Sequence, residues 1–228
     1  MDYVEIARVE TDRGELVLRE RRPAPEQSGP GAPVLELRAN GVFVMDTVEV
    51  SSERALATAA LAQVASPRAV VVGGLGLGFT MREVLADPRV EVCAVVEVEP
   101  ALVAWMRDGT IPHGPALLAD ERVRVVVADV AVAVAEARAA SYDLVLLDVD
   151  NGPGYLVHDA NAALYARPFL ESVRAVLRPG GAVAVWSAAE APDLEATLGE
   201  VFAATRAVPL EVRLQERDER YWLYVGSL

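Results

Sequence analysis

Ala69-Val70-Val71-Val72-Gly73-Gly74-Leu75-Gly76-Leu77-Gly78 is the stretch of sequence that decides the fold. A short run of β-branched residues that ends in glycines is typical of a buried parallel strand leading into a tight turn. The spacing that follows predicts a helix over 79–86, ended by Asp87-Pro88. A second apolar strand, 90–96, then leads to Glu97. This order of elements predicts the nucleotide-binding half of a doubly wound sheet.

The spacing of three glycines, Gly74, Gly76 and Gly78, indicates which nucleotide is bound. A dinucleotide fingerprint starting at Gly74 needs glycine at position 79, and Phe79 is there instead, which disfavours a nicotinamide dehydrogenase. The observed spacing is that of proteins that bind S-adenosylmethionine (SAM) through the same half-fold. The glycines let the backbone approach the ligand, and Glu97 accepts hydrogen bonds from ribose hydroxyls.

Composition excludes several classes of function. The 228 residues suit one large domain or one domain with a small appendage, and the net charge of −13 argues against nucleic acid and anionic membranes as partners. All 21 basic residues are arginine, which excludes a Schiff-base lysine and a P-loop and suggests a GC-rich bacterial genome. With two histidines and one cysteine, no metal is expected. The acidic start of the chain has no signal-peptide pattern, so we expect a cytoplasmic protein.

Two β-hairpins precede the core strands. Their strands are expected at 4–9 with 15–18, and at 34–37 with 42–45 around Asn40-Gly41, separated by a loop from Pro23 to Pro33. We therefore divide the chain into an N-terminal β module, residues 1–50, and a SAM-binding domain, residues 51–228. The module is either an edge-covering or dimerising appendage or one wall of a substrate cleft.

The rest of the chain alternates strands and helices. A helix capped by Ser51 or Ser52 is expected to run to about Ala65, and further helices are expected at 130–140, 162–177 and 194–202. With a closing hairpin from Arg206 to Val225, the pattern predicts an α/β fold. It is a doubly wound, mostly parallel seven-stranded Rossmann-like sheet of the class I methyltransferase type.

Acidic residues follow three successive strands of this sheet: Glu97, Asp129, Asp148 and Asp150. One such acid is commonly a helix N-cap, but ligands of open α/β sheets bind at the carboxyl ends of the strands, where all four would meet. The sequence therefore predicts a nucleoside-binding cleft there. Tyr155 and Trp186 could also face a ligand in this cleft, although core packing explains them equally well. His158 could act as an acid or base over the acceptor, but its position in a loop favours exposure to solvent.

From Val70 to Trp186 the chain resembles the spermidine synthase family of aminopropyltransferases. The resemblance is carried by the glycine loop with Arg82-Glu83, by Val96-Glu97-Val98-Glu99-Pro100 and by Ala128-Asp129, and then by residues 142–148, Gly152-Pro153 and 177–181. It implies that Gly74, Gly76 and Gly78 lie under the methionine-derived part of the donor, that Glu97 holds the ribose, and that Asp129 lies beside the adenine. It further implies that Asp148 and Asp150 position and deprotonate an attacking amine.

The chain departs from the family pattern in three places. Leu77 stands where the family has an aspartate that reads the aminopropyl amine, the region of Glu53 to Ala55 lacks the usual tyrosine, and Asn151 stands at the second gate position. A buried ammonium without a partner is costly, so Leu77 favours SAM over decarboxylated SAM.

The resemblance thus implies a transferase that moves a methyl or aminopropyl group from SAM or decarboxylated SAM to a small, amine-type acceptor. The alternatives are a small-molecule methyltransferase proper and a non-catalytic nucleoside-binding homologue. The N-terminal hairpins are compatible with a homodimer.

Overall fold

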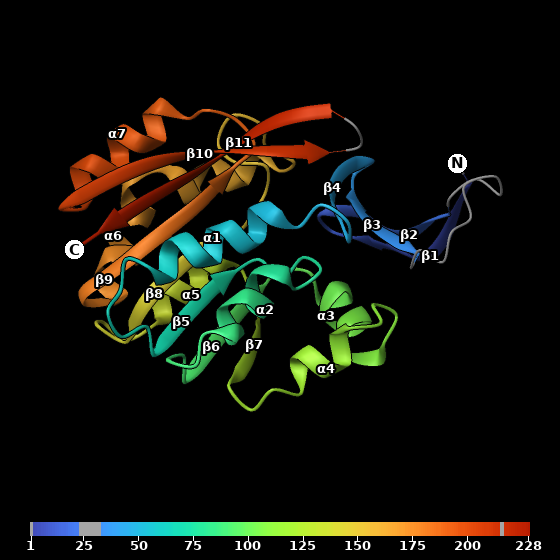
Figure 1. Cartoon of the computed structure of the whole chain (residues 1–228), viewed down its shortest axis with the longest axis horizontal. Helices are drawn as coiled ribbons and strands as arrows, with labels where there is room; N and C mark the ends of the chain where they lie inside the picture. Colours follow the sequence, from blue (N-terminus) through green and yellow to red (C-terminus); the bar gives the residue numbers. More distant parts are fainter. Residues whose placement is uncertain (1, 23–32, 215–216) are drawn as a thin grey trace.

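The computed structural model describes residues 2–22, 33–214 and 217–228, which form two sheets (Figure 1). The smaller sheet is antiparallel, in the order β1 (Asp2–Thr11), β2 (Gly14–Arg22), β3 (Val34–Ala39) and β4 (Val42–Asp46). Both expected hairpins are therefore confirmed, and Asn40 and Gly41 between β3 and β4 have the positive φ angles of a hairpin turn. The expected loop from Pro23 to Pro33 lies, except for Pro33, outside the described residues.

The larger sheet confirms the predicted doubly wound fold. Its seven described strands lie in the order β10-β11-β9-β8-β5-β6-β7. Parallel pairing joins β5 (Ala69–Gly73), β6 (Val92–Glu97), β7 (Val123–Val127), β8 (Tyr142–Leu147) and β9 (Leu177–Ser187). The closing hairpin, β10 (Ala204–Leu214) and β11 (Arg217–Ser227), adds the two antiparallel strands on the β9 side.

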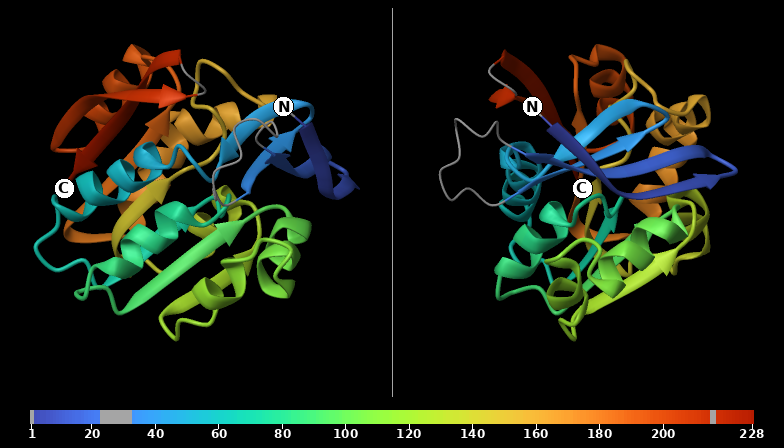
Figure 2. Two further views of the ribbon diagram at one scale, coloured as in Figure 1. Left: turned by 45° about the vertical axis from the view of Figure 1, so that its right-hand side comes forward. Right: turned by 90° about the vertical axis from the view of Figure 1, so that its right-hand side faces the viewer.

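Helices cover both faces of this sheet (Figure 2). One face packs against α1 (Ser51–Leu61), α2 (Phe79–Ala86), α3 (Pro100–Asp108) and α4 (Gly114–Leu118). The other packs against α5 (Val130–Glu136), the 3₁₀ helix η2 (Asp159–Tyr165), α6 (Arg167–Val176) and α7 (Pro192–Val201). Because the central strands β5, β6, β8 and β9 are largely buried on both sides, their side chains alternate between two apolar cores.

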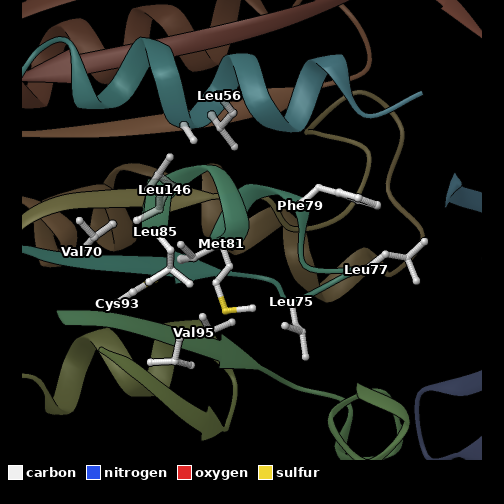
Figure 3. Close-up of a cluster of buried hydrophobic side chains, with 14 of the residues drawn as sticks. Leu56, Val70, Leu75, Leu77, Phe79, Met81, Leu85, Cys93, Val95 and Leu146 are labelled. Atoms are coloured by element: carbon white, nitrogen blue, oxygen red, sulfur yellow. The ribbon is translucent and has the colours of Figure 1, made fainter. Parts of the chain in front are cut away.

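The alternation is regular along β8, where Leu144 and Leu146 face α1 and α2 while Val145 and Leu147 face α6. Figure 3 shows Leu56 of α1 above Leu146 in the first of these cores. The same core continues into the N-terminal sheet, and it takes in Leu16, Leu18, Leu35, Leu37 and Met45. The two sheets therefore share one apolar core. The domain boundary at residue 50 stays a prediction.

Several helix boundaries differ from those expected from the sequence. The N-cap of α1 is Val50, because the Ser51 hydroxyl bonds to Glu49 and the Ser52 hydroxyl to Glu53. The helices expected at 51–65 and 130–140 end earlier, and the segment expected as one helix at 162–177 is divided into η2 and α6. The division falls at Ala166, the N-cap of α6, and Pro168 lies in the first turn of that helix, where proline is tolerated.

Candidate functional site

A cavity opens at the carboxyl ends of the parallel strands, where the strand order reverses beside β5. Its floor comes from the larger sheet and the loops that follow β5, β6, β7 and β8. The N-terminal sheet forms another wall through Arg13, Leu16, Leu37, Ala39 and Val44. All four acids expected at this edge, and two of the three glycines, line the cavity: Glu97, Asp129, Asp148, Asp150, Gly74 and Gly76.

Two glycines of the loop, Gly74 and Gly76, leave no room for a side chain at their positions. Gly74 has φ +92°, and a Cβ atom on it would lie 2.1 Å from the carbonyl oxygen of Asp148. Gly76, with φ +48°, lies against Met45, whose sulfur would be 2.7 Å from an added Cβ. Gly78 has a different position from the other two, since it is the left-handed N-cap of α2 and faces Met106. The structure therefore leaves bare backbone at Gly74 and Gly76 on the wall of the cavity.

Glu97 is buried at the end of β6, and its carboxylate is held by backbone amides on both oxygens. The N–H of Leu75 donates to one oxygen at 2.9 Å, and the N–H of Glu99 donates to the other at 2.8 Å. Burial raises the pKa of Glu97, while these amide bonds lower it. The carboxylate is thus fixed in orientation at the cavity wall, with lone pairs remaining for a ligand that offers hydroxyl groups.

Asp129 and Asp150 both bond to their own loops. Asp129 is exposed and caps α5, accepting from the N–H of Ala131 at 2.7 Å. Asp150, with φ +60°, accepts from the backbone of Asn151, Val157 and His158, and from the side chain of Asn161. Its carboxylate therefore shapes the loop of residues 150–161, which borders the cavity.

Asp148 lies against the glycine loop, because a Cβ atom on Gly74 would meet its main-chain oxygen. Its carboxylate accepts a 2.5 Å hydrogen bond from the hydroxyl of Thr80, in the first turn of α2. Burial raises the pKa of Asp148 to about 6, against the lowering effect of that bond.

A second carboxyl group lies close to Asp148. Glu53, in the first turn of α1, is 9% exposed, and burial followed by the charge of Asp148 raises its pKa to about 7. Since the charge of Asp148 raises the pKa of Glu53, a positive charge bound beside these two carboxyl groups would be attracted by both. Burial, followed by the charges of Glu219 and Glu53, raises the pKa of Tyr221 of β11 to about 12. Its ring makes an edge contact with Trp186, with the ring centroids 4.9 Å apart.

Leu77 lies away from the cavity, with its side chain fully buried in the core (Figure 3). Its N–H donates to the sulfur of Met45, and its carbonyl oxygen lies 2.6 Å from the His113 ring nitrogen Nε2. At position 77 the glycine loop therefore presents no carboxylate to the cavity.

Sequence reasoning missed several residues at the site. Arg13, Glu99 and Asn161 line the cavity, and Thr80 and Glu53 contact or influence Asp148. An acid at the predicted start of α1 was a signal for Glu53. Glu99 and Thr80 lie next to features that the sequence does indicate, Glu97 and the glycine loop, whereas Arg13 and Asn161 had no signal because they reach the cavity from distant segments.

Over residues 2–22, 33–214 and 217–228, no helix has the length and apolar character needed to span a bilayer. Over the same ranges, no group of three or more histidine, cysteine or acidic side chains is placed to hold a metal ion.

Comparisons with known proteins show which sequences and structures the chain is similar to. The family model for the spermine/spermidine synthase domain matches residues 49–202. Putrescine N-methyltransferase 3 of Nicotiana tabacum is 35% identical over 125 residues, which are 54% of this chain and 31% of that protein. Polyamine aminopropyltransferase 2 of Pseudomonas aeruginosa is 36% identical over 123 residues, or 52% of this chain and 33% of that protein. The matched region thus spans about a third of each of these relatives.

The fold comparison extends over more of the chain. A crystal structure of spermidine synthase from Thermotoga maritima superposes with a TM-score of 0.78 and 18% sequence identity, covering 98% of this chain and 72% of that one.

Proposed function

Because the chain belongs to the spermine/spermidine synthase family, we propose that it binds SAM or decarboxylated SAM and transfers a methyl or aminopropyl group to a small amine. The observation that carries the proposal is the environment of the Asp148 carboxylate. This carboxylate lines the cavity beside the glycine loop, has a raised pKa, and is paired electrostatically with Glu53. Asp148 thus lies between the part of the cavity that we assign to the nucleoside and the part that we assign to the positively charged amine.

The donor side fits a nucleoside. Glu97 is oriented by two backbone amides to accept hydrogen bonds from ribose hydroxyls, and Asp129 borders the same cavity in a position for the adenine. Gly74 and Gly76 allow the backbone to lie directly against the methionine-derived part. Gly78 supports them as the N-cap of α2. Bound there, the donor would supply a carbon attached to a positively charged sulfur. A neutral amine would attack this carbon, the carbon–sulfur bond would break, and the rest of the donor would leave as a neutral thioether.

The acceptor side of the cavity binds the amine and accepts its proton. An ammonium group between Asp148 and Glu53 is attracted by both carboxylates. The amine must lose a proton before it attacks, and a carboxyl group with a raised pKa is a better proton acceptor than an ordinary aspartate. We assign this step to Asp148, held by Thr80, and assign to Asp150 the ordering of the loop that closes the acceptor side.

The group transferred depends on the donor that binds. With Leu77 buried, no carboxylate at this position of the glycine loop pairs with the amine of decarboxylated SAM, and this favours SAM and methyl transfer. The similarity to a putrescine N-methyltransferase supports the same choice and makes a diamine the first acceptor to test. Aminopropyl transfer is the second candidate, supported by the similarity to a polyamine aminopropyltransferase.

Calorimetric titration with SAM, decarboxylated SAM and methylthioadenosine tests the donor assignment. Incubation with the donor that binds and with putrescine, followed by mass spectrometry of the product, then separates methyl from aminopropyl transfer. The Asp148→Asn variant should keep nucleoside binding and lose turnover. No binding of any of the three nucleosides would refute the enzyme assignment. Binding without turnover by the wild type, across a panel of amines, would instead support a non-catalytic homologue.

The expected cytoplasmic location, bacterial origin and homodimer stay predictions from the sequence. Size-exclusion chromatography with light scattering would test the last of them.

A further inference from the structure

The turn between β1 and β2 holds Arg13 firmly at the cavity. The N–H of Arg13 donates to the Thr11 hydroxyl oxygen at 3.1 Å, and its carbonyl oxygen accepts from the Asn40 side chain at 3.2 Å. Gly14 has φ +109°, and a Cβ there would lie 1.9 Å from the Asn40 Oδ1 atom. The backbone of the turn is therefore fixed by its own contacts, and the Arg13 side chain lines the cavity from the N-terminal sheet.

The guanidinium of Arg13 lies between two segments of the larger domain. Its Nη2 donates to Asn161 Oδ1 at 3.4 Å, and its Nε lies 3.6 Å from Glu99 Oε1. Beyond these contacts, the Glu99 N–H bonds to Glu97 and the Asn161 amide bonds to Asp150 at 2.7 Å. A continuous chain of polar contacts therefore joins the ribose-side carboxylate to the acceptor-side loop. We call its central part, Glu99, Arg13 and Asn161, the Arg13 clasp.

The contacts of this chain differ in length. Asp150 holds the loop of residues 150–161 through bonds of 2.6 Å to the N–H of Val157 and 3.2 Å to the N–H of His158. The two contacts of the guanidinium are longer than well-formed hydrogen bonds. The contacts of the Arg13 clasp are therefore the weakest in this chain and break most easily. The turn on one side and the loop on the other are each held by their own hydrogen bonds.

We propose that Arg13 is a positioning residue that closes over a nucleoside in the cavity and couples its binding to the order of the loop of residues 150–161. The inference rests on the proposed function, because it takes the bound ligand to be a nucleoside. Arginine suits the role, since its planar fork presents Nε toward Glu99 and Nη2 toward Asn161 in a fixed geometry, whereas a lysine ammonium is a compact charge on a flexible stem.

The experiment is a double-mutant cycle on nucleoside binding with Arg13→Ala, Asn161→Ala and the combined variant. Each single variant should weaken binding of the nucleoside that titrates best with the wild type by roughly tenfold or more. The combined variant should be within about twofold of the weaker single variant, because residues of one network are not additive. Arg13→Lys should stay closer to Arg13→Ala than to the wild type. Asp12→Ala, a change at the exposed neighbour on the same turn, is the matched control and should bind normally.

Hydrogen exchange of the loop gives a second readout. Amides of Val157 and His158 should exchange faster in Arg13→Ala than in the wild type, even without nucleoside, and nucleoside should protect them less. Equal binding and equal loop exchange in wild type and Arg13→Ala would overturn the clasp. Additive losses in the double variant would also overturn it, since they would mean that Arg13 and Asn161 act separately. If the wild type binds no nucleoside, the proposed function fails, and the exchange of the ligand-free variants still decides whether the clasp orders the loop.

Discussion

Replacing Glu53 by glutamine should stabilise the folded protein at alkaline pH. The pKa of Glu53 is raised from 4.5 to about 7 in the folded state, first by burial and then by the charge of Asp148. The folded state therefore holds this proton more tightly than the unfolded chain does. Stability is complete below the unfolded pKa, falls as pH rises from about 4.5 toward 7, and stays reduced above it.

The size of the effect follows from the shift. Each pKa unit corresponds to about 1.4 kcal/mol, so a rise from 4.5 to about 7 corresponds to about 3 kcal/mol of stability lost between pH 4.5 and pH 8. Glutamine keeps the shape and an oxygen for the Ser52 hydroxyl bond, yet carries no charge. Glu53→Gln should therefore be more stable than the wild type at pH 8 by up to about 3 kcal/mol, and nearly equal to it at pH 4.5.

Urea unfolding at pH 4.5, 6, 7 and 8 measures this difference for the wild type and the variant. Glu91→Gln is the matched control, since the Glu91 side chain is 67% exposed and its charge stays in water. Parallel pH profiles for the wild type and Glu53→Gln would refute the reasoning, because they would show that the Glu53 carboxyl carries no burial penalty. A stabilisation by Glu91→Gln of the same size would refute it equally, by assigning the effect to net charge.

Three further substitutions test other parts of the structure. Gly74→Ala should abolish nucleoside binding and destabilise the protein by several kcal/mol in urea unfolding, since the new Cβ would lie 2.1 Å from the Asp148 carbonyl oxygen; a variant that folds and binds normally would contradict the loop geometry. Glu97→Gln should weaken nucleoside binding at least about tenfold in calorimetry, because its amide cannot accept from both the Leu75 and Glu99 N–H groups; an unchanged affinity would remove Glu97 from the ribose site. Leu146→Ala, in the core below α1, should cost about 2–5 kcal/mol in urea unfolding without changing affinity for nucleoside; a smaller loss would mean that this core is loosely packed.

Local sequence signals were sufficient where neighbouring residues determine the structure. The bounds of α2, Phe79–Ala86, match the expectation because glycine opens the helix and Asp87-Pro88 ends it. The short helix α4 was missed because Pro112 and Gly114 indicate a loop, whereas Gly114 fits there against the backbone of Met106. That contact joins segments which the sequence does not show to be adjacent.

The same distinction applies to the candidate site. Periodicity placed Glu97, Asp129, Asp148 and Asp150 at the same edge of the sheet, and all four line the cavity. Their individual roles depend on hydrogen bonds that no pattern reveals, such as the bond from Thr80 to Asp148. The position of Gly78 at a helix cap, away from the cavity wall, likewise follows from three-dimensional packing.

The core shared by the two sheets restricts how a ligand reaches the cavity. Swinging the N-terminal sheet outward would expose Leu18 and Leu37, and re-solvating each such buried leucine costs about 1.5–3 kcal/mol. Among the described hydrogen bonds, the one that joins the loop of residues 150–161 to that sheet is the 3.4 Å bond from Arg13 Nη2 to Asn161 Oδ1. A nucleoside should therefore enter and leave past this loop, and its dissociation rate should follow loop opening while the two sheets remain together as one rigid body.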